Sequence, residues 1–145
     1  MLIQTLRRLY RQLRLQSYRS LFGSVQERSG SLSATEAFSA DVIQLLGTPT
    51  LSQFAHCLGI SQPNATYKIN SLVAKGYVEK RTSPGDRREV RLCPAEKLEM
   101  YRARGEVSFD RAVEALKRRF TPDELDITAR VLSALLDETE MEELK

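Results

Sequence analysis

The sequence predicts a mainly α-helical protein that carries one small β-hairpin. Apolar residues recur at spacings of three and four along most of the 145 residues, as one buried face of a helix requires. Only residues 77–92 alternate apolar and polar positions on both sides of a turn sequence, which is typical of a hairpin. Paired capping residues mark the helix starts, so the elements can be placed in order.

The first helix is predicted to begin at Leu2 and to end near Gly23. Its apolar stripe has spacings of four, three and four, and consists of Leu2, Leu6, Leu9 and Leu13. This helix has no neighbour in sequence that could cover its stripe. We therefore expect it to pack against a later part of the chain or against a second chain.

The second helix begins at a predicted capping box, in which Ser33 and Glu36 each satisfy a free backbone N–H group. Gly47 and Pro49 end it. Its expected apolar side consists of Phe38, Val42, Ile43, Leu45 and Leu46.

Two further helices follow at close spacing. Thr50 and Gln53 form a second capping box that opens a short helix over residues 51–58, and Gly59 ends it. Ser61 then caps a helix over residues 61–75, with Pro63 in its first turn, where the missing N–H group does no harm. A short helix, a tight turn and a second helix predict a helix-turn-helix.

A hairpin and two long helices complete the chain. Residues 77–81 and 89–92 are the predicted strands, with turn residues at 83–86 between them. One helix is predicted over residues 95–119, with Gly105 as a weak point. The sequence from Thr121 to Glu124 caps the last helix, which precedes an acidic tail.

The order of these elements predicts a winged helix-turn-helix lobe over residues 33–93 within a single domain, 1–145. Residues 1–30 and 95–145 form the predicted helical dimerisation region. The second helix of such a lobe presents its first residues to the major groove of DNA, where amide groups can read adenine and lysine can reach guanine or phosphate. The candidate DNA-binding residues on this helix are Ser61, Gln62, Pro63, Asn64, Thr66, Tyr67 and Lys68.

The hairpin supplies the remaining candidates as a wing. Arg87 and Arg88 lie at its tip, and an arginine in a narrow minor groove meets concentrated negative potential. Asp86 is expected to orient Arg88 through a paired hydrogen bond. Arg81 can meet a phosphate.

Residues 51–92 resemble the multiple-antibiotic-resistance regulator (MarR) family. The matching residues are Leu51, Ala55, Leu58, Ile60, Ser61, Thr66, Leu72, Lys75, Gly76, Tyr77, Asp86, Arg88 and Leu92. The resemblance implies a homodimer with interlocked terminal helices, a pseudo-palindromic DNA operator, and release by a small ligand or an oxidant. By the same resemblance, a small apolar or aromatic effector is expected between the dimerisation lobe and the winged lobe. Tyr67 replaces a basic residue of the family pattern, and Cys93 replaces a threonine.

The distribution of charge favours a protein that binds a polyanion, and the absence of long apolar runs favours a cytoplasmic location. Residues 1–30 carry six arginines against one acid, whereas residues 121–145 carry eight acids against two bases, which suits a molecule with one face on a polyanion. The sequence has neither an apolar run of membrane length nor the apolar core of a signal peptide, so we expect a cytoplasmic protein.

Catalysis and metal binding are not expected. The chain has no nucleophile motif, no phosphate-binding loop and a single histidine, His56, so we predict neither an enzyme nor a metal or cofactor site. Cys57 and Cys93 are expected to be buried or half-buried apolar residues, with a redox switch as the less favoured reading. The alternative function is a winged-helix module that binds another protein and not DNA.

Overall fold

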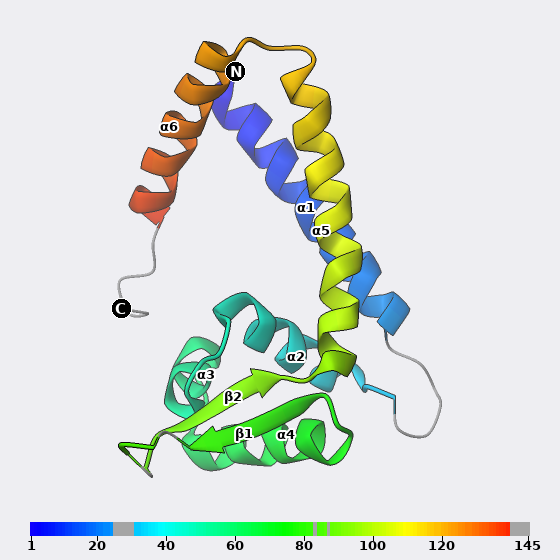
Figure 1. Ribbon diagram of the computed structural model, residues 1–145, viewed down its shortest axis with the longest axis vertical. Helices are drawn as coiled ribbons and strands as arrows, with labels where there is room; N and C mark the ends of the chain where they lie inside the picture. Colours follow the sequence, from blue (N-terminus) through cyan, green and yellow to red (C-terminus); the bar gives the residue numbers. More distant parts are fainter. Residues whose placement is uncertain (25–30, 83, 87, 140–145) are drawn as a thin grey trace. The chain divides into compact units, whose positions relative to one another are not determined.

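The computed structural model confirms the mainly helical class with one hairpin (Figure 1). It describes residues 1–24, 31–82, 84–86 and 88–139, and the side chains of these ranges other than 24 and 101–109. The elements are α1 (Leu2–Ser24), α2 (Ala34–Leu46), α3 (Leu51–Leu58), α4 (Gln62–Ala74), β1 (Val78–Thr82), β2 (Val90–Pro94), α5 (Glu96–Lys117) and α6 (Pro122–Thr139). The chain divides into two compact units, Met1–Gly105 and Glu106–Lys145, and each is described by itself.

The helix starts follow the predicted caps. Both capping boxes are complete: the Ser33 N–H group donates to Glu36 Oε2 at 2.7 Å, and the Thr50 N–H group donates to Gln53 Oε1 at 2.9 Å. Ser61 caps α4 by accepting a hydrogen bond from a backbone N–H group. Because caps act between residues three apart, the sequence alone places these starts.

The hairpin begins one residue later than predicted. Its antiparallel register runs from Val78 opposite Pro94 to Thr82 opposite Val90. Gly76 is left-handed at a φ of 75°, and the next N–H group, that of Tyr77, donates to Leu72 O at 2.9 Å. Tyr77 therefore still completes the end of α4, and β1 can start only after it.

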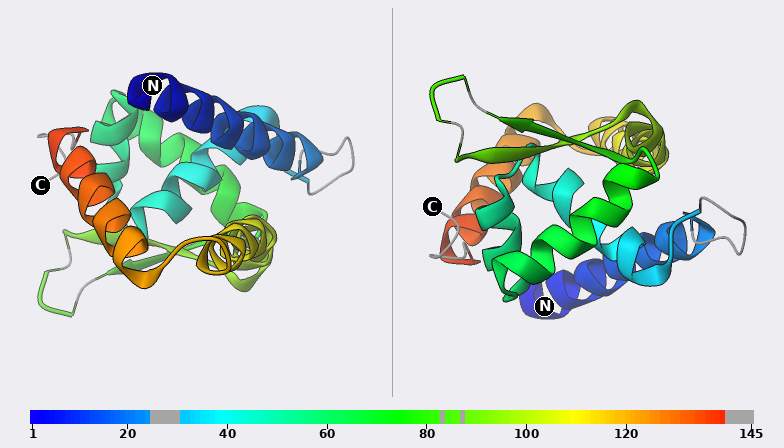
Figure 2. Two further views of the ribbon diagram at one scale, coloured as in Figure 1. Left: turned by 90° about the horizontal axis from the view of Figure 1, so that it is seen from above. Right: turned by 90° about the horizontal axis from the view of Figure 1, so that it is seen from below.

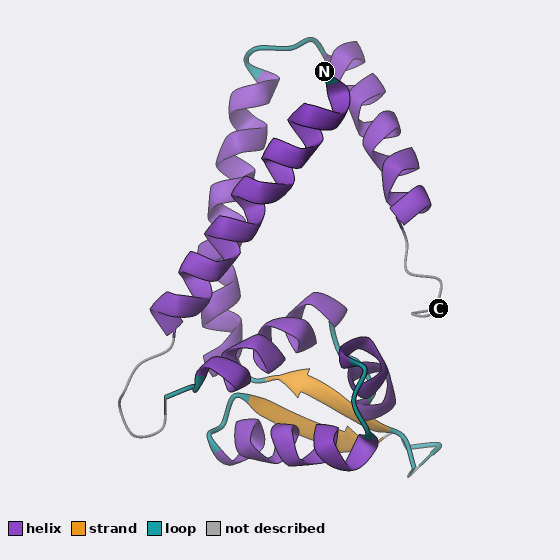
Figure 3. Cartoon of the chain, turned by 180° about the vertical axis from the view of Figure 1, so that it is seen from behind, coloured by secondary structure: helices purple, strands orange, loops and turns teal. Residues whose placement is uncertain are grey.

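The core of the first unit lies between α2, α3, α4 and the hairpin, which Figure 3 shows packed around one another. Its largest fully buried side chains are Phe54, Leu32, Ile43, Ile69, Leu72, Leu92, Leu98 and Val78. The predicted apolar side of α2 is wrong at two positions, since Phe38 is 49% exposed and Leu45 is 79% exposed. The small residues Ala37 and Ala40 face the core in their place. The Phe38 ring instead packs edge-on against the Tyr18 ring of α1, with 6.5 Å between the two ring centres.

The second unit contains the end of α5 and all of α6. No residue of α6 is buried. Its exposed apolar side chains are Ile127, Val131, Leu132, Leu135 and Leu136. Among the described residues, no helix is both long enough and apolar enough to span a membrane.

Candidate nucleic-acid interface

The turn between α3 and α4 is fixed by its backbone. Gly59 adopts a left-handed conformation at φ 63° and ψ 35°, and its N–H group bonds the carbonyls of Ala55 and His56. The Ile60 N–H group also donates to Ala55 O, at 3.0 Å, and the Ile60 side chain packs against the core. A residue with a Cβ atom would be strained at position 59, so glycine makes this tight turn possible.

The start of α4 is exposed along the positions that the sequence predicts for DNA contact. Ser61, Gln62, Pro63 and Asn64 are exposed, and Tyr67 is 78% exposed. The two remaining predicted residues of this helix, Thr66 and Lys68, are half-buried. The N-cap and the first two turns of α4 therefore carry all seven candidates, five of them exposed and two half-buried.

Sequence reasoning missed one residue of this surface. Ser52, an exposed residue in the first turn of α3, accepts a hydrogen bond from Gln62 Nε2 at 2.7 Å. The two residues are ten positions apart on different helices, so no local pattern could reveal the contact. The helix-turn-helix pattern predicts only that α3 packs over α4.

The hairpin lies beside α4 and is tied to it. α4 and β1 run in opposite directions because a short turn joins them, so β1 ends on the side where α4 begins (Figure 2, seen from below). Lys80 Nζ donates to Asn70 Oδ1 at 2.6 Å, and this hydrogen bond joins β1 to α4. Arg81 is exposed and pairs with Glu79 at 3.0 Å; the hydrogen bond with this carboxylate raises the pKa of Arg81.

The wing tip is ordered by Asp86 in a way that differs from the prediction. Asp86 Oδ1 accepts a hydrogen bond from the backbone N–H group of Arg88 at 2.8 Å. In the described part of the chain, Asp86 therefore contacts the backbone of Arg88 and not its guanidinium group. The carboxylate thus fixes the turn and leaves the exposed guanidinium of Arg88 in solvent. The prediction for Arg87 lies outside the described residues.

A mostly buried carboxylate holds the far end of α4. Glu36 accepts hydrogen bonds from Lys75 Nζ at 2.6 Å and from the hydroxyl group of Ser71, in addition to the Ser33 N–H group of its capping box. Burial alone would raise the pKa of Glu36, but these donors outweigh it and lower the pKa to about 2. Lys75 also donates to Ser31 O at 2.8 Å. One carboxylate therefore joins the segment before α2, the start of α2 and the last turn of α4.

The first turn of α5 is bound to the same end of α4. Lys97 Nζ lies 4.0 Å from the centre of the Tyr77 ring and 3.3 Å from Lys75 O. Gln44 Nε2 of α2 donates to Leu98 O at 2.8 Å. Cation–π and hydrogen-bond contacts thus join the start of α5 to the end of α4.

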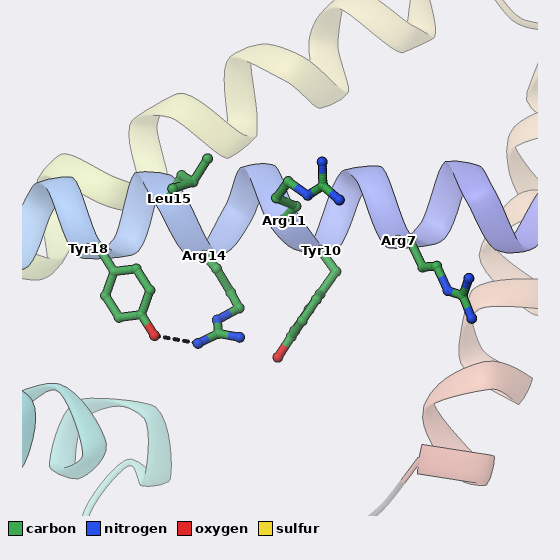
Figure 4. Close-up of a pocket in the computed structure, with 6 residues that line it drawn as sticks. All are labelled: Arg7, Tyr10, Arg11, Arg14, Leu15 and Tyr18. Carbon is green, nitrogen blue, oxygen red and sulfur yellow. Dashed lines mark hydrogen bonds between the residues drawn. The ribbon is translucent and has the colours of Figure 1, made fainter.

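A shallow hollow of about 380 Å³ lies along α1 (Figure 4). Arg14 is held between Tyr10 and Tyr18, with its guanidinium carbon 5.5 and 5.4 Å from the two ring centres and Nη2 donating to Tyr18 Oη at 2.5 Å. The lining is completed by Arg7, Arg11 and Leu15. This basic and aromatic surface was not predicted, although the arginine content of residues 1–30 indicated part of it.

The cysteines and the histidine occupy ordinary positions. Cys57 and Cys93 are half-buried and free, as expected for small apolar residues, and Cys93 lies opposite Glu79 in the hairpin. His56 is exposed on α3. Over the described ranges, no group of three His, Cys, Asp or Glu side chains could hold a metal ion.

Comparisons with known proteins agree with this architecture. Residues 41–89 match a family model described as MarR family. The chain is 29% identical over 132 residues to the uncharacterized HTH-type transcriptional regulator YcgE of Bacillus subtilis (strain 168), covering 86% of this chain and 82% of that protein.

Two solved structures share the fold. The chain is similar to Streptococcus pneumoniae FabT in complex with DNA, at a TM-score of 0.61 and 23% identity over the whole of both chains. It is also similar to a mutant MarR from E. coli complexed with operator DNA, at a TM-score of 0.50 and 20% identity over 92% of this chain and 95% of that one.

Proposed function

We propose that this chain is a DNA-binding transcriptional regulator of the MarR family, which it resembles over residues 41–89, and that it acts as a homodimeric repressor on pseudo-palindromic duplex operators. The observation that carries the proposal is the exposed start of α4 on the side of the lobe where β1 ends. A helix end and a hairpin loop arranged in this way can enter neighbouring grooves of a duplex.

Each predicted residue has a place in this proposal. Amide and hydroxyl groups on α4 read base edges in the major groove, Lys68 and Arg81 meet phosphates, and Arg88 enters the minor groove. Asp86 supports Arg88 by fixing the turn. The proposed DNA-binding set is Ser61, Gln62, Pro63, Asn64, Thr66, Tyr67, Lys68, Arg81, Asp86, Arg87 and Arg88.

Exposed apolar residues on the terminal helices support a homodimer. Leu2, Ile3, Leu9 and Leu13 on α1 are 40–65% exposed, and five apolar residues of α6 are 38–68% exposed. Apolar rows of this extent mark surfaces that a partner covers. α1 carries five arginines and no acid, whereas α6 carries five acids and one arginine, so the two helices are also complementary in charge. Light scattering is expected to give the mass of a dimer, and a stable monomer at micromolar concentration would contradict the proposal.

A small aromatic molecule is the proposed effector. The α1 hollow supports this class because tyrosine rings can stack on an aromatic ring and guanidinium groups can pair with a carboxylate. A thermal-shift screen of aromatic acids is expected to find at least one compound that raises the unfolding temperature and weakens DNA binding. An Arg14→Ala variant should lose that shift.

A non-enzymatic role and a cytoplasmic location complete the proposal. MarR-family regulators are generally not enzymes, and we propose the same for this chain. A regulator must also reach the chromosome, which a cytoplasmic protein can do.

Selection of bound sequences from random duplex DNA tests the central claim. The expected result is two half-sites related by a two-fold axis and centred about one helical turn apart. The logarithm of the affinity should fall with the logarithm of salt concentration, with a slope of about −0.9 per phosphate neutralised. No enrichment and no salt dependence would favour the protein-binding module instead.

A further inference from the structure

The side chain of Gln62 is restrained by a neighbour that has no assigned role. Gln62 is the first residue of α4, and its Nε2 atom donates to Ser52 Oγ at 2.7 Å. Both side chains are exposed, so the rest of the Gln62 amide faces solvent. Over the described part of the chain, the amide side chain of Asn64, the other amide in the first turn of α4, makes no such bond.

The backbone on both sides of this hydrogen bond is fixed. The start of α3 is held by the capping box of Thr50 and by an isolated bridge between Thr50 and Arg91. The Leu92 N–H group of β2 also donates to Pro49 O at 2.8 Å. On the other side, the left-handed Gly59 and the cap of α4 set the position of Gln62. The bond therefore joins two rigid helix ends.

Restraint matters because a free glutamine has many rotamers. Fixing such a side chain on binding costs on the order of 1–2 kcal/mol of conformational entropy. A bond that is present before DNA arrives removes part of that cost and selects one orientation of the amide plane.

The amide retains the groups that base recognition needs. Nε2 has two hydrogen atoms, and Ser52 accepts only one of them. Bidentate recognition requires that Ser52 accept the hydrogen that points away from Oε1, which leaves the second hydrogen and Oε1 side by side in the amide plane. A donor and an acceptor in that arrangement match N7 and the N6 amino group of adenine in the major groove.

We propose that Ser52 is a positioning residue that holds Gln62 for bidentate recognition of one adenine in each half-site. This inference rests on the proposed DNA-binding function. It separates two roles on one surface: Gln62 touches the base, and Ser52 determines how Gln62 is presented. Because the Ser52 hydroxyl hydrogen is not used in this bond, it can also donate to a phosphate, so the test must distinguish the two contributions.

The experiment uses the full chain and the operator selected by the wild-type protein. Affinities are measured for that operator and for duplexes with each base pair replaced in turn. Ser52→Ala and Gln62→Ala are both expected to lose about tenfold of the discrimination at the same adenine, within the ~1–3 kcal/mol that one bidentate pair contributes. The double variant should lose no more than Gln62→Ala alone, whereas Ser52→Thr, which keeps the hydroxyl group, should retain the wild-type preference.

A modified base gives an independent readout. Replacing the contacted adenine by 7-deazaadenine removes the N7 acceptor and leaves base pairing intact. The wild type is expected to lose affinity for this duplex, while Ser52→Ala should lose clearly less and Gln62→Ala should lose none. A fold defect would change affinity for every duplex alike and could not produce this pattern.

The outcomes distinguish a failure of the proposed DNA-binding function from a failure of the positioning role of Ser52. If wild type selects no DNA sequence, the proposed function fails and the inference fails with it. If wild type selects an operator but Ser52→Ala keeps full discrimination at every position, only the inference is overturned. A uniform loss at all positions would assign Ser52 to a phosphate contact and would also overturn it.

Discussion

The two described arginines of the wing, Arg81 and Arg88, differ in whether their guanidinium groups are already paired with an acid. The backbone N–H group of Arg88 is held by Asp86, whereas its side chain is exposed and has no acidic partner in the described part of the chain. Arg81, by contrast, is already paired with Glu79. An unpaired guanidinium can bind DNA without first breaking an ion pair, so Arg88 should contribute more to affinity than Arg81 does.

We therefore expect Arg88→Ala to weaken operator binding by about 1–3 kcal/mol, or roughly 5- to 150-fold. A fluorescence titration of the operator duplex measures this change. Arg118→Ala, which removes the same charge from an exposed position outside the winged lobe, is the control and should bind nearly as wild type does. Equal affinities for Arg88→Ala and wild type would exclude a minor-groove role.

Gly59 is a second position at which one residue decides local geometry. Gly59→Ala should lower the free energy of unfolding by about 1–2 kcal/mol, because an L-residue is strained at φ 63° even though no atom lies within 4 Å of the added Cβ. Gly59→Asn should lose less, since asparagine tolerates this conformation. Urea denaturation at one fixed protein concentration compares the three proteins, and an equal loss for Ala and Asn would contradict the conformational explanation.

At the scale of elements, α4 is anchored at its far end by Glu36, which is 12% exposed and bonded to Lys75. The pKa of Glu36 is lowered from 4.5 to about 2 in the folded protein. A lowered pKa means that the folded state binds its proton less readily than the unfolded state does. The stabilisation is therefore complete above pH 4.5 and is lost as the pH falls toward 2.

This predicts a pH-dependent difference between wild type and Glu36→Gln. The variant keeps the capping box but loses the ion pair, so it should be less stable by about 1–3 kcal/mol at pH 7. The difference should shrink between pH 4.5 and pH 2, as followed by urea denaturation. Glu114→Gln is the matched control: its ion pair with Lys117 is more than half exposed and should contribute little at any pH.

The same elements show how far the sequence could predict the structure. Helix starts and the helix-turn-helix were predicted because caps, glycines and apolar spacings act within a few residues. The strand ends shifted by a residue or two because Tyr77 belongs to the end of α4. Phe38 and Leu45 were misplaced because apolar character does not tell which face of a helix meets the core. Contacts such as Ser52 with Gln62 depend on how helices pack, which no local pattern encodes.

For the whole molecule, the proposed homodimer would be held by apolar side chains that are exposed in the single chain. The exposed apolar row of α6 and the opposite charges of α1 and α6 are the features that a second chain would use. Removing apolar surface from that row should act on assembly and leave the winged lobe folded.

Leu135→Glu is the corresponding test. Leu135 is 38% exposed on α6, and a charge at a covered apolar interface is costly. We expect light scattering to show a shift toward monomer, with much weaker operator binding because a single lobe contacts only one half-site. Asp137→Lys reverses a charge on the same helix without removing apolar surface, so it should change the mass far less. An unchanged dimer in Leu135→Glu would rule out this part of α6 as an interface.

The buried core has a consequence for how such a protein can change over time. Among the described residues, every buried apolar side chain lies between Leu32 and Leu98. The lobe over these residues therefore closes its interior largely with its own side chains, and Leu21 of α1 packs against that core. Substitutions that retune a signal or a partner preference can accumulate in the outer helices while the lobe that recognises an operator stays intact.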